Sequence, residues 1–314
     1  MRLRTFSLGV LALVIPLLAV TARADILGSA DTYAVLATGT VTNPTTNAAT
    51  IVNGDMGAVS CTGFTVGCTF GPGMVSGATN LSNPPYTTAL ADSNKAYLAL
   101  KNTPDTGGFT CLGLGLGCLN NVAPGVYDST LSSTLLHGAL VLDAGSNTDP
   151  IWIFQMAFGF TTDPNSSVSV IGAGAAAAGV YFEVGSQATL GDNSTLIGNV
   201  LAGTKVAFDP GAEITCGRAF TDTPAGTDVT FAGNNPASTV GVINKVSDTC
   251  TQSSSGFNGG VIVTPPGGGP GIVAAPEPGT FVLLLAGLLA IGLLMYRKPS
   301  GAKCGVVNST PAAA

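Results

Sequence analysis

The chain has 314 residues, of which 46% are hydrophobic and 9% charged, with 43 Gly and 19 Pro. Its formal net charge of −6 argues against nucleic acid as a partner, because phosphate binding needs a basic surface. A single histidine argues against imidazole acid/base catalysis and a His-rich metal site, so we expect no metal and no cofactor.

The first 24 residues have the three parts of a secretory signal peptide. Arg2 and Arg4 supply a positive start, residues 8–20 are apolar, and Ala22-Arg23-Ala24 has the small-residue spacing of a cleavage site. We predict cleavage after Ala24 by signal peptidase and export of the body that follows. An uncleaved anchor is the alternative, which the short apolar run disfavours.

Six cysteines lie in the predicted exported part, an even number that suits disulfides in an oxidising compartment. Cys61 and Cys68 have the same seven-residue separation as Cys111 and Cys118, so each pair is predicted to close a small loop. This choice rests on locality and leaves Cys216 with Cys250. Metal binding by four of the thiols is the alternative, and the absence of C-x-x-C spacing disfavours it.

One α-helix is predicted over residues 86–101. Its apolar residues recur at helical spacing on one face, at Tyr86, Ala89, Leu90, Ala96, Tyr97 and Leu100. Pro84-Pro85 precedes this segment and Pro104 follows it, so both boundaries are marked. We expect the helix to lie along the side of a larger apolar body.

A repeat follows in the second half of the body. Residues 186–202 and 204–220 align at a constant shift of 18, with apolar or small residues at alternate positions and Gly, Asp or Asn in the turns. Residues 227–235 restart the pattern and residues 160–170 show it more loosely. Such a repeat predicts a β-helix, whose stacked turns bury a column of apolar side chains. An ordinary β-sandwich is the alternative, but its strand pairs rarely keep a constant offset.

Several segments, in their order along the chain, resemble the large microbial ice-binding protein family: LGSADTYAVLATGTVTN (27–43), IVNGDMG (51–57), PGVYD (124–128), GALVLDA (138–144), IWIFQM (151–156), YFEVGSQATLG (181–191) and STLIGNVLA (194–202). The resemblance implies a mainly β fold, a discontinuous right-handed β-solenoid of triangular section with one α-helix packed alongside, over residues 25–250. The resemblance further implies coils that are not stacked in strict chain order. It also implies ice as the partner.

A polysaccharide-cleaving enzyme is another use of a β-helix, and it needs clustered carboxylates. The acidic residues here fall mostly in turns, where Asp bonds its own backbone: Asp128, Asp143, Asp149, Asp163, Asp192, Asp209 and Asp222. No nucleophile motif accompanies them. We therefore predict that the protein is not an enzyme.

Ice binding needs a flat, rigid, rather apolar surface with methyl and hydroxyl groups at a regular spacing. Stacked strands repeat every ~4.8 Å, near spacings in the ice lattice, and Thr offers both groups on a stiff side chain. With the apolar positions of the repeat pointing inward, the outward candidates are Thr161, Ser169, Thr189, Thr195, Ile197, Asn199 and Thr215. Simple solvation of a strand surface is the alternative reading of each.

Three ladders of outward residues follow from the alignment. Thr161–Thr189–Ala207 and Ser169–Ile197–Thr215 are small and uncharged, whereas Ser167–Thr195–Glu213 carries a charge that is unfavourable for ice. The sequence does not choose among the faces.

The C-terminal part has the composition of a tether and a sorting signal. Residues 251–275 are rich in Ser, Gly and Pro, as in a flexible linker. Residues 276–298 combine Pro276-Glu277-Pro278, an apolar run from Phe281 to Tyr296 and a basic end, and they resemble the PEP-CTERM sorting signal of Gram-negative bacteria. The resemblance implies a membrane helix and processing by an exosortase. Residues 299–314 form a short tail that departs from that pattern, and a plain single-pass anchor is the alternative.

Two functions of different classes follow. The first is an exported ice-binding protein, antifreeze or recrystallisation-inhibiting, found at the cell surface, in the extracellular matrix or secreted. The second is a surface or matrix protein for structure or adhesion that keeps the fold without ice activity. A flat, uncharged face of Thr, Ser and Ala favours the first, and an irregular charged face favours the second.

Overall fold

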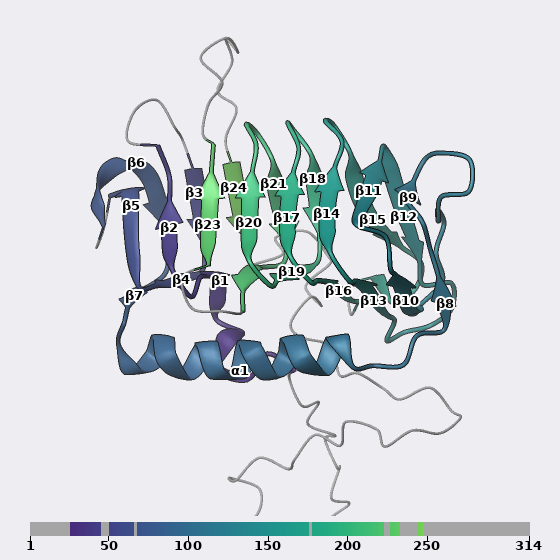
Figure 1. Cartoon of the computed structure of the whole chain (residues 1–314), viewed down its shortest axis with the longest axis horizontal. Helices are drawn as coiled ribbons and strands as arrows, with labels where there is room; N and C mark the ends of the chain where they lie inside the picture. Colours follow the sequence, from purple (N-terminus) through teal and green to yellow (C-terminus); the bar gives the residue numbers. More distant parts are fainter. Residues whose placement is uncertain are drawn as a thin grey trace, which may run out of the picture. The chain divides into compact units, whose positions relative to one another are not determined.

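Parallel strands stacked side by side form the body of the protein in the computed structural model (Figure 1). The structure describes residues 26–44, 50–65, 68–175, 178–222, 227–232 and 244–247. The predicted signal peptide with Ala24, the linker 251–275, the sorting signal 276–298 and Cys250 lie outside these residues. No described helix is long and apolar enough to span a membrane.

The strands form three faces. Sheet A has nine strands, in the order β7 (Thr79–Leu81), β4 (Asp55–Ala58), β1 (Tyr33–Leu36), β22 (Ala219–Thr221), β19 (Asn199–Ala202), β16 (Gly179–Val184), β13 (Ile151–Met156), β10 (Gly125–Ser129) and β8 (Gly107–Gly108). The other fifteen strands make sheets B and C, which β6 (Thr69–Val75) joins at one end by pairing with a strand of each.

Sheet B contains, in order from β6, β5 (Ser60–Phe64), β2 (Thr40–Thr42), β23 (Asp228–Phe231), β20 (Lys205–Phe208), β17 (Gln187–Leu190), β14 (Gly159–Thr162), β11 (Ser133–His137) and β9 (Leu112–Gly113). Sheet C contains, in order from β6, β3 (Thr50–Asn53), β24 (Asn244–Ser247), β21 (Glu213–Cys216), β18 (Thr195–Ile197), β15 (Ser167–Ile171) and β12 (Ala139–Asp143). Each later coil visits A, B and C in turn, which is the predicted solenoid.

The stacking order is discontinuous in the sequence. The first strands, β1 to β3, lie in the interior of their sheets, where each pairs with one of the last strands, β22 to β24. The chain then builds toward the β7 end, and α1 (Pro84–Lys101) leads it to the opposite end, where β8 and β9 begin (Figure 1). This arrangement explains why the 18-residue repeat does not extend to the N-terminal strands.

The core lies inside the three sheets and is apolar. Every second residue of a strand points inward, as in β17, where Ala188 and Leu190 are fully buried. Aromatic rings stack from coil to coil: the ring centroids of Phe154 and Phe182 are 5.2 Å apart, and those of Phe160 and Phe182 5.4 Å apart. Stacking of these rings favours one alignment of the strands that carry them.

The helix α1 covers sheet A, as predicted, and begins at Pro84, two residues earlier than expected. Pro at the first helical positions costs no hydrogen bond, and the Asn83 side chain accepts one from the Tyr86 N–H at 3.2 Å. At the other end, Gln155 Nε2 of β13 donates to the carbonyls of Leu100 and Thr103, each at 2.6 Å. The predicted apolar face packs against sheet A, and Leu90 is its least buried member.

Disulfide-bonded loops lie toward both ends of the stack. Cys61 of β5 is bonded to Cys68 near the β6 end, and Cys111 to Cys118 beside β9 at the opposite end, so both local pairings are confirmed. Cys216 is also disulfide-bonded. Its predicted partner, Cys250, lies outside the described residues.

Candidate functional site

Sheets B and C are the two faces available for a surface site, because α1 covers sheet A. The layer under the helix contains tightly packed apolar side chains, with Tyr181, Leu201 and Phe220 of sheet A fully buried. An extended flat ligand therefore has access only to sheets B and C.

One row of residues on sheet B consists almost entirely of threonines. We call it the threonine row, and its members face each other on successive strands: Thr161, Thr189, Ala207, Thr230, Thr42 and Thr62. Each member is half-buried and uncharged. Leu135, paired with Thr161, continues the row toward β9. With strands ~4.8 Å apart, these six positions span about 24 Å at one regular repeat.

A second outward row runs beside the threonine row, two residues earlier on each strand and thus about 6.6 Å away. It is mixed in character and contains Ser133, Gly159, Gln187, Lys205, Asp228, Thr40 and Ser60. Lys205 and Asp228 are cross-strand neighbours of opposite charge. Gln187 Nε2 donates to Thr189 Oγ1 at 2.8 Å, so this row also orients a hydroxyl of the threonine row.

The threonine row has a rigid support. The residues on either side of its members point inward and are buried, among them Val206 and Val229. Behind them the rings of Phe208 and Phe231 stack with centroids 4.7 Å apart. Because β-branched Thr has little χ1 freedom on such a strand, the methyl and hydroxyl groups are held in fixed directions.

Sheet C is less regular. The predicted Ser167–Thr195–Glu213 ladder is present, with its charge. The Ser169–Ile197–Thr215 prediction is wrong at its last step, because the register shifts after Leu196 and Ile197 faces Cys216. Thr215 Oγ1 donates to the Leu196 carbonyl at 3.3 Å, an internal use of this hydroxyl.

The predicted site residues are therefore divided among three faces. Thr161 and Thr189 lie together in the threonine row, whereas Ser169, Thr195, Ile197 and Thr215 lie on sheet C. The prediction for Asn199 is wrong: its side chain is 0% exposed under the helix layer. There it donates to the Val180 carbonyl and accepts from Arg218 Nη1 at 3.1 Å. The 18-residue offset between coils does not hold at the corner between sheets C and A, which a glycine forms. Extending the inward–outward alternation across this corner therefore predicts the wrong orientation for Asn199.

Three members of the threonine row were missed by the sequence reasoning: Thr42, Thr62 and Thr230. Two of them belong to the N-terminal coils, which join this row only through the out-of-order stacking. The alternation Thr40-Val41-Thr42 indicates a strand with outward threonines, but it does not show which strands lie next to that strand.

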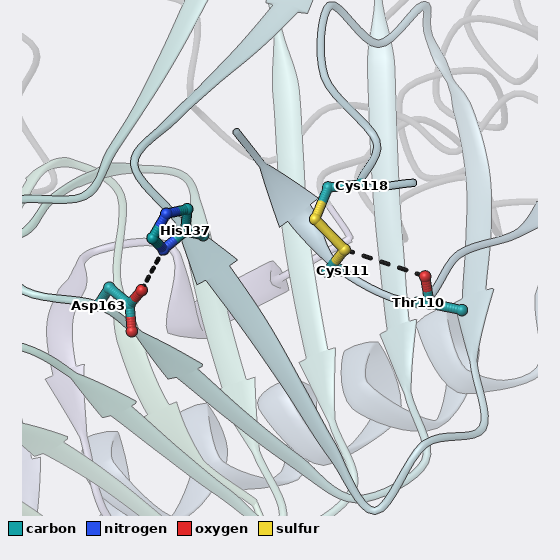
Figure 2. The surroundings of a disulfide bond; sticks show 5 residues. All are labelled: Thr110, Cys111, Cys118, His137 and Asp163. Carbon is teal, nitrogen blue, oxygen red and sulfur yellow. Dashed lines mark hydrogen bonds and ion pairs between the residues drawn. A yellow bond between two sulfur atoms is a disulfide. The ribbon is translucent and has the colours of Figure 1, made fainter. Parts of the chain in front are cut away.

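Other ionisable groups lie at the ends of the sheet B strands. Figure 2 shows His137 at the end of β11 with its ring Nδ1 paired to Asp163 Oδ2, near the Cys111–Cys118 loop. Burial, and then the nearby Asp192, raises the pKa of Asp209 in the turn after β20. Among the described residues, no group of three or more His, Cys, Asp or Glu side chains is placed to hold a metal ion.

Comparison with known families assigns this architecture. The family model described as ice-binding-like matches residues 35–235, well over half of the chain. The chain belongs to this ice-binding-like family. The match covers all three sheets apart from the first residues of β1 and the whole of β24.

Several proteins and solved structures named as ice-binding proteins are similar to this chain. A protein of Nostoc sp. (strain HG1), named ice-binding protein, is 34% identical over 229 residues, which are 73% of this chain and 76% of the relative. The crystal structure of an ice-binding protein from the Antarctic ascomycete Antarctomyces psychrotrophicus matches with a TM-score of 0.57 and 30% identity, covering 72% of this chain and 98% of that one. An ice-binding protein from an Antarctic biological consortium matches with a TM-score of 0.57 and 29% identity, covering 74% and 95%.

Proposed function

We propose that this protein binds the surface of ice through sheet B, as an antifreeze or recrystallisation-inhibiting protein, without catalysis. The observation that carries the proposal is the threonine row, an uncharged ladder in register over six strands. Membership of the ice-binding-like family and the names of its relatives support the same ligand.

The mechanism is complementarity over an area. Methyl groups of the row favour ordered water above the sheet, and the hydroxyls fix that water at the strand repeat of ~4.8 Å. Water held in this pattern joins a growing crystal, and the adsorbed protein then blocks further growth at that point. A rigid face is needed because a mobile one would lose conformational entropy on binding.

We also propose that the protein is exported and works outside the cytoplasm. The predicted signal peptide 1–24 and the two disulfides within the body support export. The resemblance of residues 276–298 to a PEP-CTERM signal supports delivery to the cell surface or matrix by way of an exosortase, with the run from Phe281 to Tyr296 in the membrane before processing. Mass spectrometry of the native protein tests both cleavages.

A bulky residue in the threonine row tests the ice face. We expect Thr189→Tyr to reduce thermal hysteresis and recrystallisation inhibition severalfold, because the ring lifts the crystal away from its neighbours. The matched control is Ser169→Tyr, which places the same side chain at a half-buried position of β15 on sheet C. Both variants should keep the thermal midpoint of the native protein.

Loss of activity in Ser169→Tyr with retention in Thr189→Tyr would move the site to sheet C. A native protein that leaves ice growth unchanged at high concentration would refute ice binding itself.

A further inference from the structure

Two buried carboxyl groups lie in the layer between α1 and sheet A, and the proposed ice face uses neither. Glu183 projects from β16 with 2% of its surface exposed, and Asp222 follows β22 with 3% exposed. Buried carboxylates normally have full sets of donors, since an isolated charge in an apolar layer is costly. Here Glu183 Oε1 and Asp222 Oδ2 have no hydrogen-bond partner among the described residues.

Each carboxyl is joined to the same side of the helix. Ser93 Oγ donates to Asp222 Oδ1 in a short hydrogen bond, and the Tyr97 hydroxyl donates to the Glu183 carboxyl. Ser93 and Tyr97 are one helical turn apart, and both are buried. The two carboxyls therefore hold the buried face of α1 at consecutive turns.

The surroundings favour the protonated form of both groups. Among the described residues, the charged and titratable groups that act on this pair are Tyr97 and Lys101 on α1 and Asp128 on β10. Burial raises the pKa of Glu183 to about 7, against the opposing effects of Tyr97 and Lys101. Burial likewise raises the pKa of Asp222 to about 7, and that of Tyr97 also rises, so its hydroxyl stays a donor.

We propose that Glu183 and Asp222 form a proton-dependent latch, which holds α1 on sheet A when both are protonated and loosens the helix when both are ionised. In the protonated state the two hydrogen bonds to α1 cross an apolar layer without buried charge. Ionisation places two negative charges under the same two helical turns, beside buried apolar side chains such as Leu100 and Phe220. The latch does not depend on ice binding.

The direction of the pH effect follows from proton linkage. The ordinary pKa values of the two groups are 4.5 and 3.8, below their values in the folded protein. The folded state therefore binds more protons than the detached state between about pH 4 and pH 7, and attachment of α1 weakens as the pH rises through that range.

Amide hydrogen exchange of the body, corrected for the intrinsic pH dependence of exchange, tests the latch. Between pH 5 and pH 8 we expect protection of the α1 amides to fall at least about tenfold, while protection in β17 and β20 stays constant. In the double variant E183Q/D222N the α1 protection should not change with pH. D105N, which neutralises an exposed carboxyl beyond the helix, is the matched control and should behave as the native protein does.

Two results would overturn the latch: α1 protection that does not depend on pH in the native protein, or an equal loss of protection in β17 and β20. Carbon NMR titration of the Glu183 carboxyl in the native protein gives the same answer if the double variant does not fold, since a midpoint near 4.5 would also refute it.

Discussion

Ala207 occupies the centre of the threonine row, between Thr189 and Thr230, and is the member that lacks a hydroxyl. The six positions otherwise offer one hydroxyl per strand at a fixed repeat. We expect Ala207→Thr to increase thermal hysteresis by about half or more, because it completes the row without disturbing the buried Val206 and Phe208 on either side. Ice-growth measurements at matched protein concentration check the gain.

Ala207→Val separates the two groups that Thr supplies. Val adds the same branched shape without the hydroxyl. Equal gains in the two variants would assign the effect to the apolar shape, and a loss in Ala207→Thr would contradict the row as the contact surface.

The alternation of apolar residues in the sequence placed Thr161 and Thr189 correctly, since local sterics decide which way a strand residue points. It could not choose between sheets B and C, because Ser169 and Thr195 show the same alternation on sheet C. The choice depends on which strands are neighbours, and on the register shift after Leu196. Neither of these is a local property of the sequence.

At the scale of elements, Arg218 fastens the N-terminal segment to the later coils. The residue is 1% exposed. Its Nε donates to the Asp31 carbonyl at 2.9 Å, and its Nη1 donates to Asn199 Oδ1 at 3.1 Å. Asp31 lies two residues before β1, which pairs with β22. The Arg218 side chain therefore connects both sides of the junction between the first and last strands. These buried hydrogen bonds give Arg218 a structural role.

We expect Arg218→Met to lower the free energy of unfolding by about 2–4 kcal/mol, because it leaves the Asp31 carbonyl and the Asn199 amide oxygen without their donors. Urea unfolding followed by circular dichroism measures the change. Lys205→Met, the same apolar replacement on the half-exposed mixed row, is the control and should change stability by less than about 1 kcal/mol. A similar loss in both variants would show that Arg218 contributes no more than a surface cation.

The helix shows how far an element can be predicted from sequence. Its apolar face was correct because tertiary packing uses the periodicity that the sequence displays. The contacts at both ends of the helix involve residues that are distant from it in the sequence. Gln155 caps it from β13, and Gly57 leaves room for Tyr86 and Leu36, whose atoms lie within 3.0 Å of where a Cβ would stand. Such contacts become visible only when the stacking order is known.

For the whole molecule, the discontinuous order makes the two ends of the stack structurally distinct. The β6 end is built from the N-terminal strands, and there β6 connects sheet B to sheet C by pairing with a strand of each. The β9 end is built from the strands after α1. Each end has its own disulfide, which constrains a loop of seven-residue separation and limits fraying of the last strands.

We expect removal of either disulfide by a Cys→Ser pair to lower the free energy of unfolding by about 2–3 kcal/mol, the loop-closure entropy of so short a loop. Removing both, Cys61 with Cys68 and Cys111 with Cys118, should add to about 5 kcal/mol, because distant sites in one cooperative unit act independently. Urea unfolding of the two double variants and the quadruple variant measures the sum. A total well below about 5 kcal/mol would mean that the ends unfold separately from the middle.

Thermal hysteresis distinguishes the roles of the two disulfides. Loss of Cys61–Cys68 frees β5, which carries Thr62, and should lower the activity. Loss of Cys111–Cys118 leaves all six members of the threonine row in place and should not.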